Sequence, residues 1–429
     1  MRLLLGAALF ASAAFDARGQ KVLDLEDALT LAERSSPNIH MAENALRTAE
    51  LSLSELNTTG LPQLGAVVNG IYTPSPPTFG YDPAITNGGE LSGRIVLRQT
   101  LYDAGVRSLR SDQLTGDRER LSHERRLAQL DLALSVKLAF AEALRSEAAT
   151  ALEARSVDEL ESYLSLLKRL HAGGSASATD LLKTEVETSN ARMALMRVRE
   201  DASGAKIALE EIVGLPPDTS LILAGSLSDS LASPEEATLL GGEPSSDSTI
   251  DMTVAGMLIQ RSLVEEDIAR RESLPAISFV ADGGYVSSGD NFRVPASERI
   301  NGIGYSVGIG IEVPILTWGA TGLRTEQREI ATDDLRRRME LLRRSIASDQ
   351  RRVRIQLANA RARLGPVREN SSRAEQNFIL TKSKFAAGAS LSLEVLSAQQ
   401  SLTEARLAEV QALADIRALQ ARFERLTAR

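Results

Sequence analysis

The sequence has 429 residues and no cysteine. This absence excludes disulfide bonds, thiolate metal sites, cysteine nucleophiles and a lipidated N-terminal cysteine. The three histidines, His40, His123 and His171, are scattered along the chain and show no metal-ligand spacing. No glycine-rich phosphate-binding loop follows a predicted strand. We therefore expect neither a catalytic constellation nor a metal or cofactor site.

Aromatic residues make up 4% of the chain, which is little for a compact globular core of this size. Long helices that pack through leucine and alanine would explain the shortage. No segment after the N-terminal stretch has the ~18 apolar residues of a membrane-spanning helix, so entry into a membrane would require a β-barrel. The net charge of -8 argues against a nucleic-acid partner.

Residues 1–19 have the character of a secretory signal peptide. Arg2 provides the basic start, the apolar stretch from Leu3 to Phe15 is too short to span a membrane, and small residues follow. A buried N-terminal helix is the alternative. A signal peptide would place the mature chain outside the cytoplasm.

The sequence contains an internal repeat. Three landmarks recur 213 or 214 residues later: Leu61-Pro62 as Leu274-Pro275, Gly105 as Gly319, and Gly174 as Gly388. Chance matches would not keep this spacing over most of the chain, so we infer a duplication. The predicted organisation is a first repeat over residues 20–214, a linker rich in serine, glycine and proline over 215–249, and a second repeat over 250–429.

Each repeat has the same predicted order of one helix, two strands and two further helices. The predicted elements of the first repeat are helices 25–60, 104–171 and 177–213 and strands 64–73 and 90–102. Those of the second are helices 250–273, 320–386 and 392–427 and strands 276–286 and 300–314. The longest helices have apolar residues at three- and four-residue steps, which is typical of a coiled-coil-like array. Gly365-Pro366 interrupts the second of them and predicts a kink.

The predicted strands have one apolar face. The repeat aligns Ile95 with Ile309 and Leu97 with Ile311, so the same face is apolar in both copies. This alternation occurs in transmembrane barrels and also in the half-buried sheets of soluble proteins. Four strands cannot close a barrel, because membrane barrels begin at about eight strands and lipid tolerates no open edge. A barrel would therefore need several chains, and three chains would supply twelve strands.

With this plan the chain resembles the TolC-type outer-membrane efflux family. The resemblance covers nearly all of the sequence from about Leu25, and it rests on the duplicated order of elements, the Leu-Pro pairs, the Pro-Ile-Leu-Thr-Trp-Gly segment at 314–319 and the two turn glycines. It implies a homotrimer of the mainly α class. Duplicated long-helix hairpins would form a trimeric α-barrel, and four strands per chain would contribute to a 12-stranded transmembrane β-barrel.

The function that the resemblance implies is that of a channel-tunnel and not of an enzyme. It would lie in the outer membrane with its helical part in the periplasm, and it would export solutes from an inner-membrane pump to the exterior. Its implied partners are a periplasmic adaptor (membrane fusion protein), the inner-membrane transporter and outer-membrane lipid. The alternative is a periplasmic coiled-coil adaptor or scaffold without a pore, but an adaptor has one hairpin and not two copies of a strand pair with a hairpin.

The resemblance also places the turns at Gly174 and Gly388 at the periplasmic tip, where the tunnel closes. It assigns adaptor docking to the residues of these two turns: Gly174, Ser175, Gly388, Ala389 and Ser390. Two positions depart from the family pattern, because Ser390 replaces a basic residue and Ser397 replaces a second gate acid. These departures remove the basis for a network of charge pairs at the tip.

The predicted periplasmic gate consists of Phe385, Glu394 and, by repeat symmetry, Asp180. Three copies of one carboxylate around a threefold axis would attract cations and raise one another's pKa. Helix capping is the other interpretation: Ser177 and Asp180 form a candidate capping box, and Glu394 lies near a helix start, where negative charge is favourable. We prefer the capping role for Asp180 and the gate for Glu394.

Four charged residues of the strands are predicted to face the barrel lumen: Arg94, Arg98, Asp282 and Glu312. The simplest role for these side chains is to keep the bore wet. The sequence thus predicts a gate at the turns of the long helix hairpins and a polar bore lined by the strands.

Overall fold

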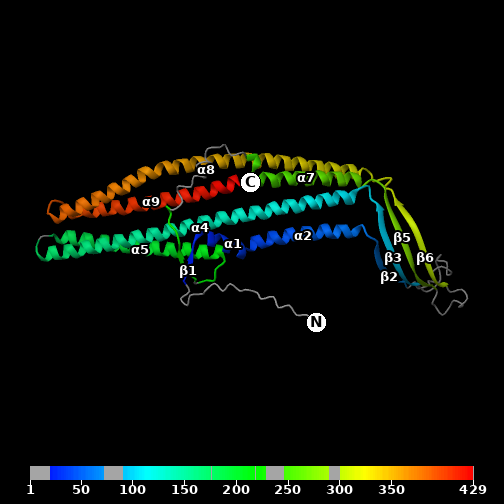
Figure 1. The fold of residues 1–429 in the computed structure, drawn as a ribbon, viewed down its shortest axis with the longest axis horizontal. Helices are drawn as coiled ribbons and strands as arrows, with labels where there is room; N and C mark the ends of the chain where they lie inside the picture. The colour runs from blue at the N-terminus through cyan, green and yellow to red at the C-terminus, as the bar shows by residue number, and fades with distance from the viewer. Residues whose placement is uncertain are drawn as a thin grey trace, which may run out of the picture. The chain divides into compact units, whose positions relative to one another are not determined.

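The computed structural model describes residues 20–71, 90–174, 176–217, 219–228, 246–288 and 300–428. Residues 1–19, predicted as a signal peptide, lie outside this part. Four long helices dominate the fold (Figure 1), namely α4 (Val106–Ala172), α5 (Ala178–Val213), α8 (Ala320–Ala386) and α9 (Ser392–Thr427). Helices α4 and α8 have 67 residues each, and α5 and α9 have 36 each. The duplicated helices therefore have matching lengths.

Shorter elements complete the two repeats. They are β1 (Gln20–Leu23), α1 (Leu25–Ser35), α2 (Pro37–Thr59), β2 (Gln63–Ile71), β3 (Glu90–Tyr102), β4 (Ser220–Leu223), η1 (Ser246–Ser248), α7 (Ile250–Arg271), β5 (Ala276–Ser288) and β6 (Ile300–Glu312). Among the helices of the described residues, none combines the length and the apolarity needed to cross a membrane.

Two local predictions differ from the structure. The helix predicted over 25–60 is broken at Ser36, whose extended ψ of 118° ends α1. The cause is Pro37, because a proline ring disfavours helical geometry in the preceding residue and is well suited to the first position of the next helix. The segment predicted as a linker over 215–249 contains β4, which pairs in parallel with β1.

The proline of the second repeat does not end its helix. Helix α8 continues through Pro366, as the predicted helix over 320–386 requires. A proline inside a helix removes one backbone hydrogen bond and crowds the preceding turn. The kink at this position stays a prediction.

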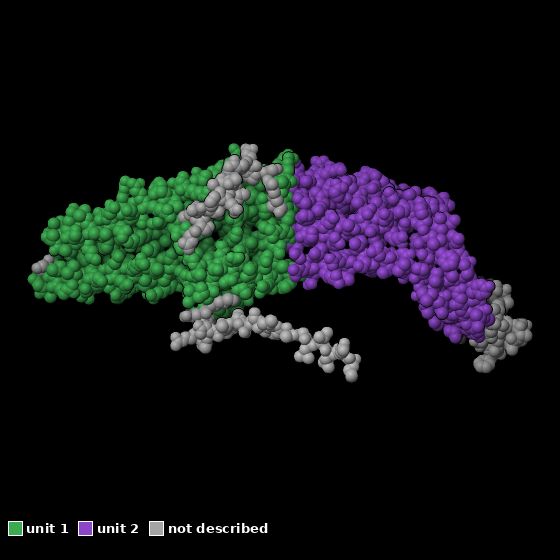
Figure 2. Space-filling view, viewed as in Figure 1, with its two compact units in different colours: residues 1–41, 126–250, 343–429 green, residues 42–125, 251–342 purple. Residues whose placement is uncertain are grey.

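The chain divides into two compact units (Figure 2). Unit 1 comprises residues 1–41, 126–250 and 343–429, and unit 2 comprises residues 42–125 and 251–342. Residues of α4 and α8 belong to both units.

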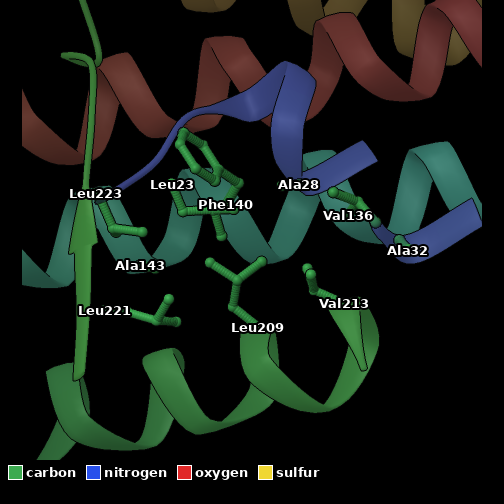
Figure 3. Packing of buried hydrophobic residues seen from close by; sticks show 10 residues of the cluster. All are labelled: Leu23, Ala28, Ala32, Val136, Phe140, Ala143, Leu209, Val213, Leu221 and Leu223. Atoms are coloured by element: carbon green, nitrogen blue, oxygen red, sulfur yellow. The ribbon is translucent and has the colours of Figure 1, made fainter. Parts of the chain in front are cut away.

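The first core of unit 1 gathers around α4 (Figure 3). Helix α4 contributes Phe140 and Val136, and Leu209 of α5 and Leu23 of β1 are fully buried against them. Leu221 of β4 belongs to the same cluster. Burial of one such leucine stabilises the fold by roughly 1.5–3 kcal/mol. The small β1–β4 sheet therefore closes a hydrophobic core and is part of the packed structure of unit 1.

Unit 2 contains an antiparallel sheet in the order β2-β3-β5-β6. The strand pairs of the two repeats meet where β3 pairs with β5, for example Leu97 with Ala281. Strands β2 and β6 form the two edges of the sheet in this chain. Such edges present unpaired backbone donors and acceptors, which must be paired or covered before the sheet can enter lipid.

Candidate functional site

The helix hairpins of unit 1 turn at two glycines. Gly174 and Gly388 both have a φ of 75°, in the left-handed region that glycine adopts without steric cost. After α8, the Gly388 N–H donates to the Phe385 carbonyl at 2.9 Å and the Ala389 N–H to the Lys384 carbonyl at 2.8 Å. These bonds satisfy carbonyl groups at the helix end while the chain reverses. Ser175, one of the predicted docking residues, lies outside the described part of the chain.

Asp180 takes part in a capping box at the start of α5. The Asp180 N–H donates to Ser177 Oγ at 3.0 Å, and Ser177 Oγ donates to Asp180 Oδ2 at 2.6 Å. His171 closes the same turn with a bond of 2.9 Å between its imidazole Nδ1 and the Ala176 carbonyl. Ser177 therefore caps α5 as a capping box requires, whereas the Asp180 carboxylate bonds the hydroxyl of Ser177 and not its backbone N–H.

Glu394 is exposed in the first turn of α9. Its carboxylate accepts a hydrogen bond from Ser390 Oγ, and its N–H donates to the Leu391 carbonyl at 3.0 Å. The N-cap residue Leu391 makes no side-chain capping bond. Glu394 therefore serves the helix start, yet its exposed carboxylate remains accessible to solutes. Ser390, which takes the position of a basic residue in the family pattern, forms this bond in place of an ion pair.

Phe385 is half-buried and packs against a core cluster of unit 1. Its ring meets Tyr163 of α4 edge-on, with the ring centroids 5.3 Å apart. The Tyr163 hydroxyl donates to Ser392 Oγ at 3.0 Å, and both residues are buried. Burial raises the pKa of Tyr163. Tyr163 thus joins the first hairpin to the start of α9.

A buried polar cluster lies further along the same helices. Gln399 Nε2 donates to Ser156 Oγ at 3.4 Å, and Thr403 Oγ1 donates to the same oxygen at 3.2 Å. Sequence reasoning missed Tyr163 and Ser156 because their partners lie 229 and 243 residues away. One signal was available: Gln399 falls between Leu396 and Leu402, at the spacing of an apolar helix face.

A groove of about 1200 Å³ opens beside this cluster, between residues of α4, α5 and α9. Its lining includes Glu153, Asn190, Leu393 and Gln400. Glu153 is 8% exposed, and desolvation by burial raises the pKa of its carboxyl group. The groove therefore combines apolar walls with one buried titratable group.

In unit 2, the strand register places the four predicted lumen residues on one face of the sheet. Directly paired residues share a face, and the register puts Val96 opposite Asp282, with Arg94 and Arg98 two positions away along β3. Glu312 is on this face of β6, six residues after Ser306, which pairs with Asp282 and donates to its carboxylate. An ion pair of 3.9 Å joins Arg94 to Asp282.

The opposite face of the sheet is apolar and exposed. It carries aliphatic and aromatic side chains from all four strands, among them Leu64, Val68, Leu91, Ile95, Tyr285, Ile303, Tyr305, Val307, Ile309 and Ile311. Ile303 and Tyr305 are 90% and 89% exposed. A surface of this kind is rare on a soluble monomer and indicates contact with lipid or with another protein.

These features, long duplicated hairpins joined to an amphipathic sheet, define the fold of outer-membrane channel proteins. The structure superposes on the outer membrane protein VceC of Vibrio cholerae with a TM-score of 0.75, at 18% identity, covering 94% of this chain and 96% of that one. It also superposes on the open MtrE outer membrane channel of Neisseria gonorrhoeae with a TM-score of 0.74, at 16% identity, covering 94% and 89% of the two chains.

The outer membrane efflux protein family model matches residues 28–215 and 249–429. The chain belongs to this family, whose members are outer-membrane transporters, and its location is the outer membrane. It is 24% identical to the pyoverdine export outer membrane protein OpmQ of Pseudomonas aeruginosa over 73% of its own length, and 24% identical to the outer membrane efflux protein BepC of Brucella suis over 57%. These alignments span 63% and 51% of the two relatives.

Proposed function

We propose that three copies of this chain form an outer-membrane channel-tunnel that exports solutes delivered by an inner-membrane pump. The observation that carries the proposal is the sheet of unit 2, which has one charged face, one exposed apolar face and two edge strands. Pairing β6 of one copy with β2 of the next would remove every edge and close twelve strands around a polar lumen. Arg94, Arg98, Asp282 and Glu312 would then keep the lumen hydrated.

The turns at Gly174 and Gly388 are the proposed periplasmic tip, where a periplasmic adaptor docks and the tunnel opens. The docking residues are those predicted from the sequence: Gly174, Ser175, Gly388, Ala389 and Ser390. Glu394 is the preferred gate carboxylate, because it is exposed next to the second turn. Asp180 acts as a cap, since its carboxylate is engaged with Ser177. Phe385 supports the gate through its contact with Tyr163.

Purification in detergent with a measurement of molar mass tests the assembly, because the proposal requires a trimer. Recovery of a monomer from the soluble fraction of the periplasm would contradict it. That result would favour a coiled-coil adaptor or scaffold without a pore, the alternative that family membership disfavours.

Single-channel recording in planar bilayers tests the gate. We expect Glu394→Gln to lower the cation preference, because it removes three charges from the mouth of a trimer. Asp180→Asn is the matched control from the other repeat, and we expect it to leave ion selectivity unchanged. Equal selectivity in the wild type and Glu394→Gln would remove Glu394 from the constriction.

A further inference from the structure

The passage from strand to long helix has the same backbone in both repeats. Ala104 after β3 and Trp318 after β6 have φ values of 55° and 51°, and the following Gly105 and Gly319 have φ values of 81° and 80°. A side chain in the left-handed region is strained, and for a bulky residue such a φ is a genuine outlier. The duplication therefore conserves an unfavourable geometry, yet places the largest side chain, the one tryptophan of the chain, at the second junction.

The first junction is covered by the end of α7. Arg271 Nη1 donates to the Ala104 carbonyl at 3.3 Å, and Ala104 is 8% exposed. A Cβ atom added at Gly105 would lie 2.7 Å from the same guanidinium nitrogen. The surface at Ala104 is thus filled by an arginine from the neighbouring helix.

The second junction is open in the single chain. Trp318 is 87% exposed, and a Cβ atom added at Gly319 would meet no atom within 4 Å. The apolar neighbours Ile315 and Leu316 are 92% and 66% exposed. The segment between β6 and α8 is therefore apolar and exposed.

The internal repeat indicates what covers the second junction. Helix α7 lies between α4 and α8: Glu265 accepts from Gln113 of α4 at 3.0 Å and pairs with Arg328 of α8 at 2.9 Å. Its counterpart α2 lies against α4 through the Arg125–Glu43 ion pair of 3.9 Å. If the repeat pattern continues around a closed ring, the α2 beside each α8 belongs to the next copy.

We propose that Trp318 packs against the α2 end of a second copy of this chain, at Thr58. Thr58 is the repeat counterpart of Arg271, because the Leu-Pro pairs that follow the two helices set the alignment. The large side chain then comes from the helix end at the first junction, where Arg271 covers Ala104. It comes from the strand end at the second, where Trp318 covers the small Thr58 of the next copy. The exchange explains why a tryptophan occupies this strained position.

At the second junction, a smaller, uncharged residue also replaces at least one partner of each ion pair found around the first. Within the chain, α4 pairs with α7 through Arg261–Asp117 at 3.2 Å and with the residue after α7 through Arg110–Glu272 at 3.8 Å. The counterparts between copies are Arg324 with Thr59 and Thr48 with Ala331. The ion pairs thus have no counterpart between copies. Contact between copies at this junction therefore depends on burial of Trp318.

Cross-linking tests this contact directly, because the chain has no native cysteine. The double variant Thr58→Cys/Trp318→Cys, treated with a short bismaleimide in detergent, should give covalent dimers and trimers. The matched control Ala104→Cys/Arg271→Cys should react within one chain and run as a monomer. Each single-cysteine variant should give no covalent trimer.

The proposal rests on the proposed trimer, so the molar mass is measured on the same samples. A trimer by mass in which Thr58→Cys/Trp318→Cys yields no cross-linked species refutes the junction contact and leaves the channel intact. A monomer by mass refutes the channel itself.

Tryptophan fluorescence provides a second readout that leaves Trp318 in place. A nitroxide label on Thr58→Cys should quench the Trp318 emission of the trimer strongly. The same label on Thr48→Cys, about 15 Å further along the helix, should quench it weakly. Quenching of the unlabelled wild type by brominated lipid in vesicles would instead place Trp318 in the membrane and overturn the proposal.

Discussion

The hydroxyl of Tyr163 offers the most direct test of how the hairpins of unit 1 are held together. The change Tyr163→Phe keeps the ring and its edge-on contact with Phe385, and it removes the oxygen that bonds Ser392 Oγ at 3.0 Å. Ser392 is 4% exposed, so water cannot readily replace the lost partner. The substitution therefore isolates one buried hydrogen bond.

The expected cost follows from the burial of both groups. A buried donor or acceptor that loses its partner costs about 1–3 kcal/mol. We expect the local opening free energy at the start of α9 to fall by about 1–2 kcal/mol, which is about a 5- to 30-fold increase in the open population. The double variant Tyr163→Phe/Ser392→Ala should recover part of this loss, because neither group is then left unpaired. The coupling energy should be about 1 kcal/mol.

Hydrogen exchange with mass spectrometry on the detergent-solubilised protein measures this effect. Peptides covering the start of α9 and residues 156–167 should exchange faster in Tyr163→Phe, and those of the β1–β4 core should not change. Ser165→Ala is the matched control, because this exposed serine of α4 bonds only its own helix in the described contacts. Unchanged exchange at the start of α9, or equal losses in the single and double variants, would refute the reasoning.

Two further predictions concern the same region. Burial raises the pKa of Glu153 above its ordinary value of 4.5. The folded state therefore loses stability as the pH rises through the pKa that Glu153 has in the folded protein, because the buried carboxyl group must then ionise. Glu153→Gln should therefore stabilise the surrounding helices at neutral pH and have no effect below pH 4.5, measured by hydrogen exchange at both pH values; equal effects at both would contradict the assignment. Gly388→Ala should cost about 1–2 kcal/mol, since its φ of 75° is strained for any L side chain. Proteolysis at the turn should then begin at a lower temperature than in the wild type. Gly365→Ala, inside α8, is the control that should not destabilise the protein.

The elements that could be predicted from the sequence are those with long periodic patterns. The bounds of the four long helices follow from their apolar spacing and, for α4, α5 and α8, from the glycines that follow them. The break at Ser36 was missed although Pro37 signals it, because the apolar pattern continues across the proline. The β1–β4 sheet was missed because each strand has four residues and the two lie 200 positions apart along the sequence.

The candidate site shows the same division between local and distant contacts. Ser177 and Asp180 lie within four residues of each other, so their sequence pattern predicted the bond from the Asp180 N–H to Ser177 Oγ. The contact of Tyr163 with Ser392 depends on packing between two hairpins, and no local pattern encodes it. For Glu394, the sequence predicted proximity to a helix start, but not that Ser390 would bond its carboxylate.

The two repeats differ most where their helices begin. The start of α5 is stabilised by its own residues, because Ser177 caps the helix and His171 closes the turn before it. The N-cap of α9 is Leu391, whose side chain cannot accept a hydrogen bond from the first N–H groups of the helix. The start of α9 is stabilised instead by Ser390 and by Tyr163 of α4. A helix start held by a distant partner can be released when that partner moves, whereas a locally capped start keeps its cap. The duplication therefore supplies one locally capped hairpin end and one whose order depends on hairpin packing, which is the asymmetry that the proposed gate at the second turn would use.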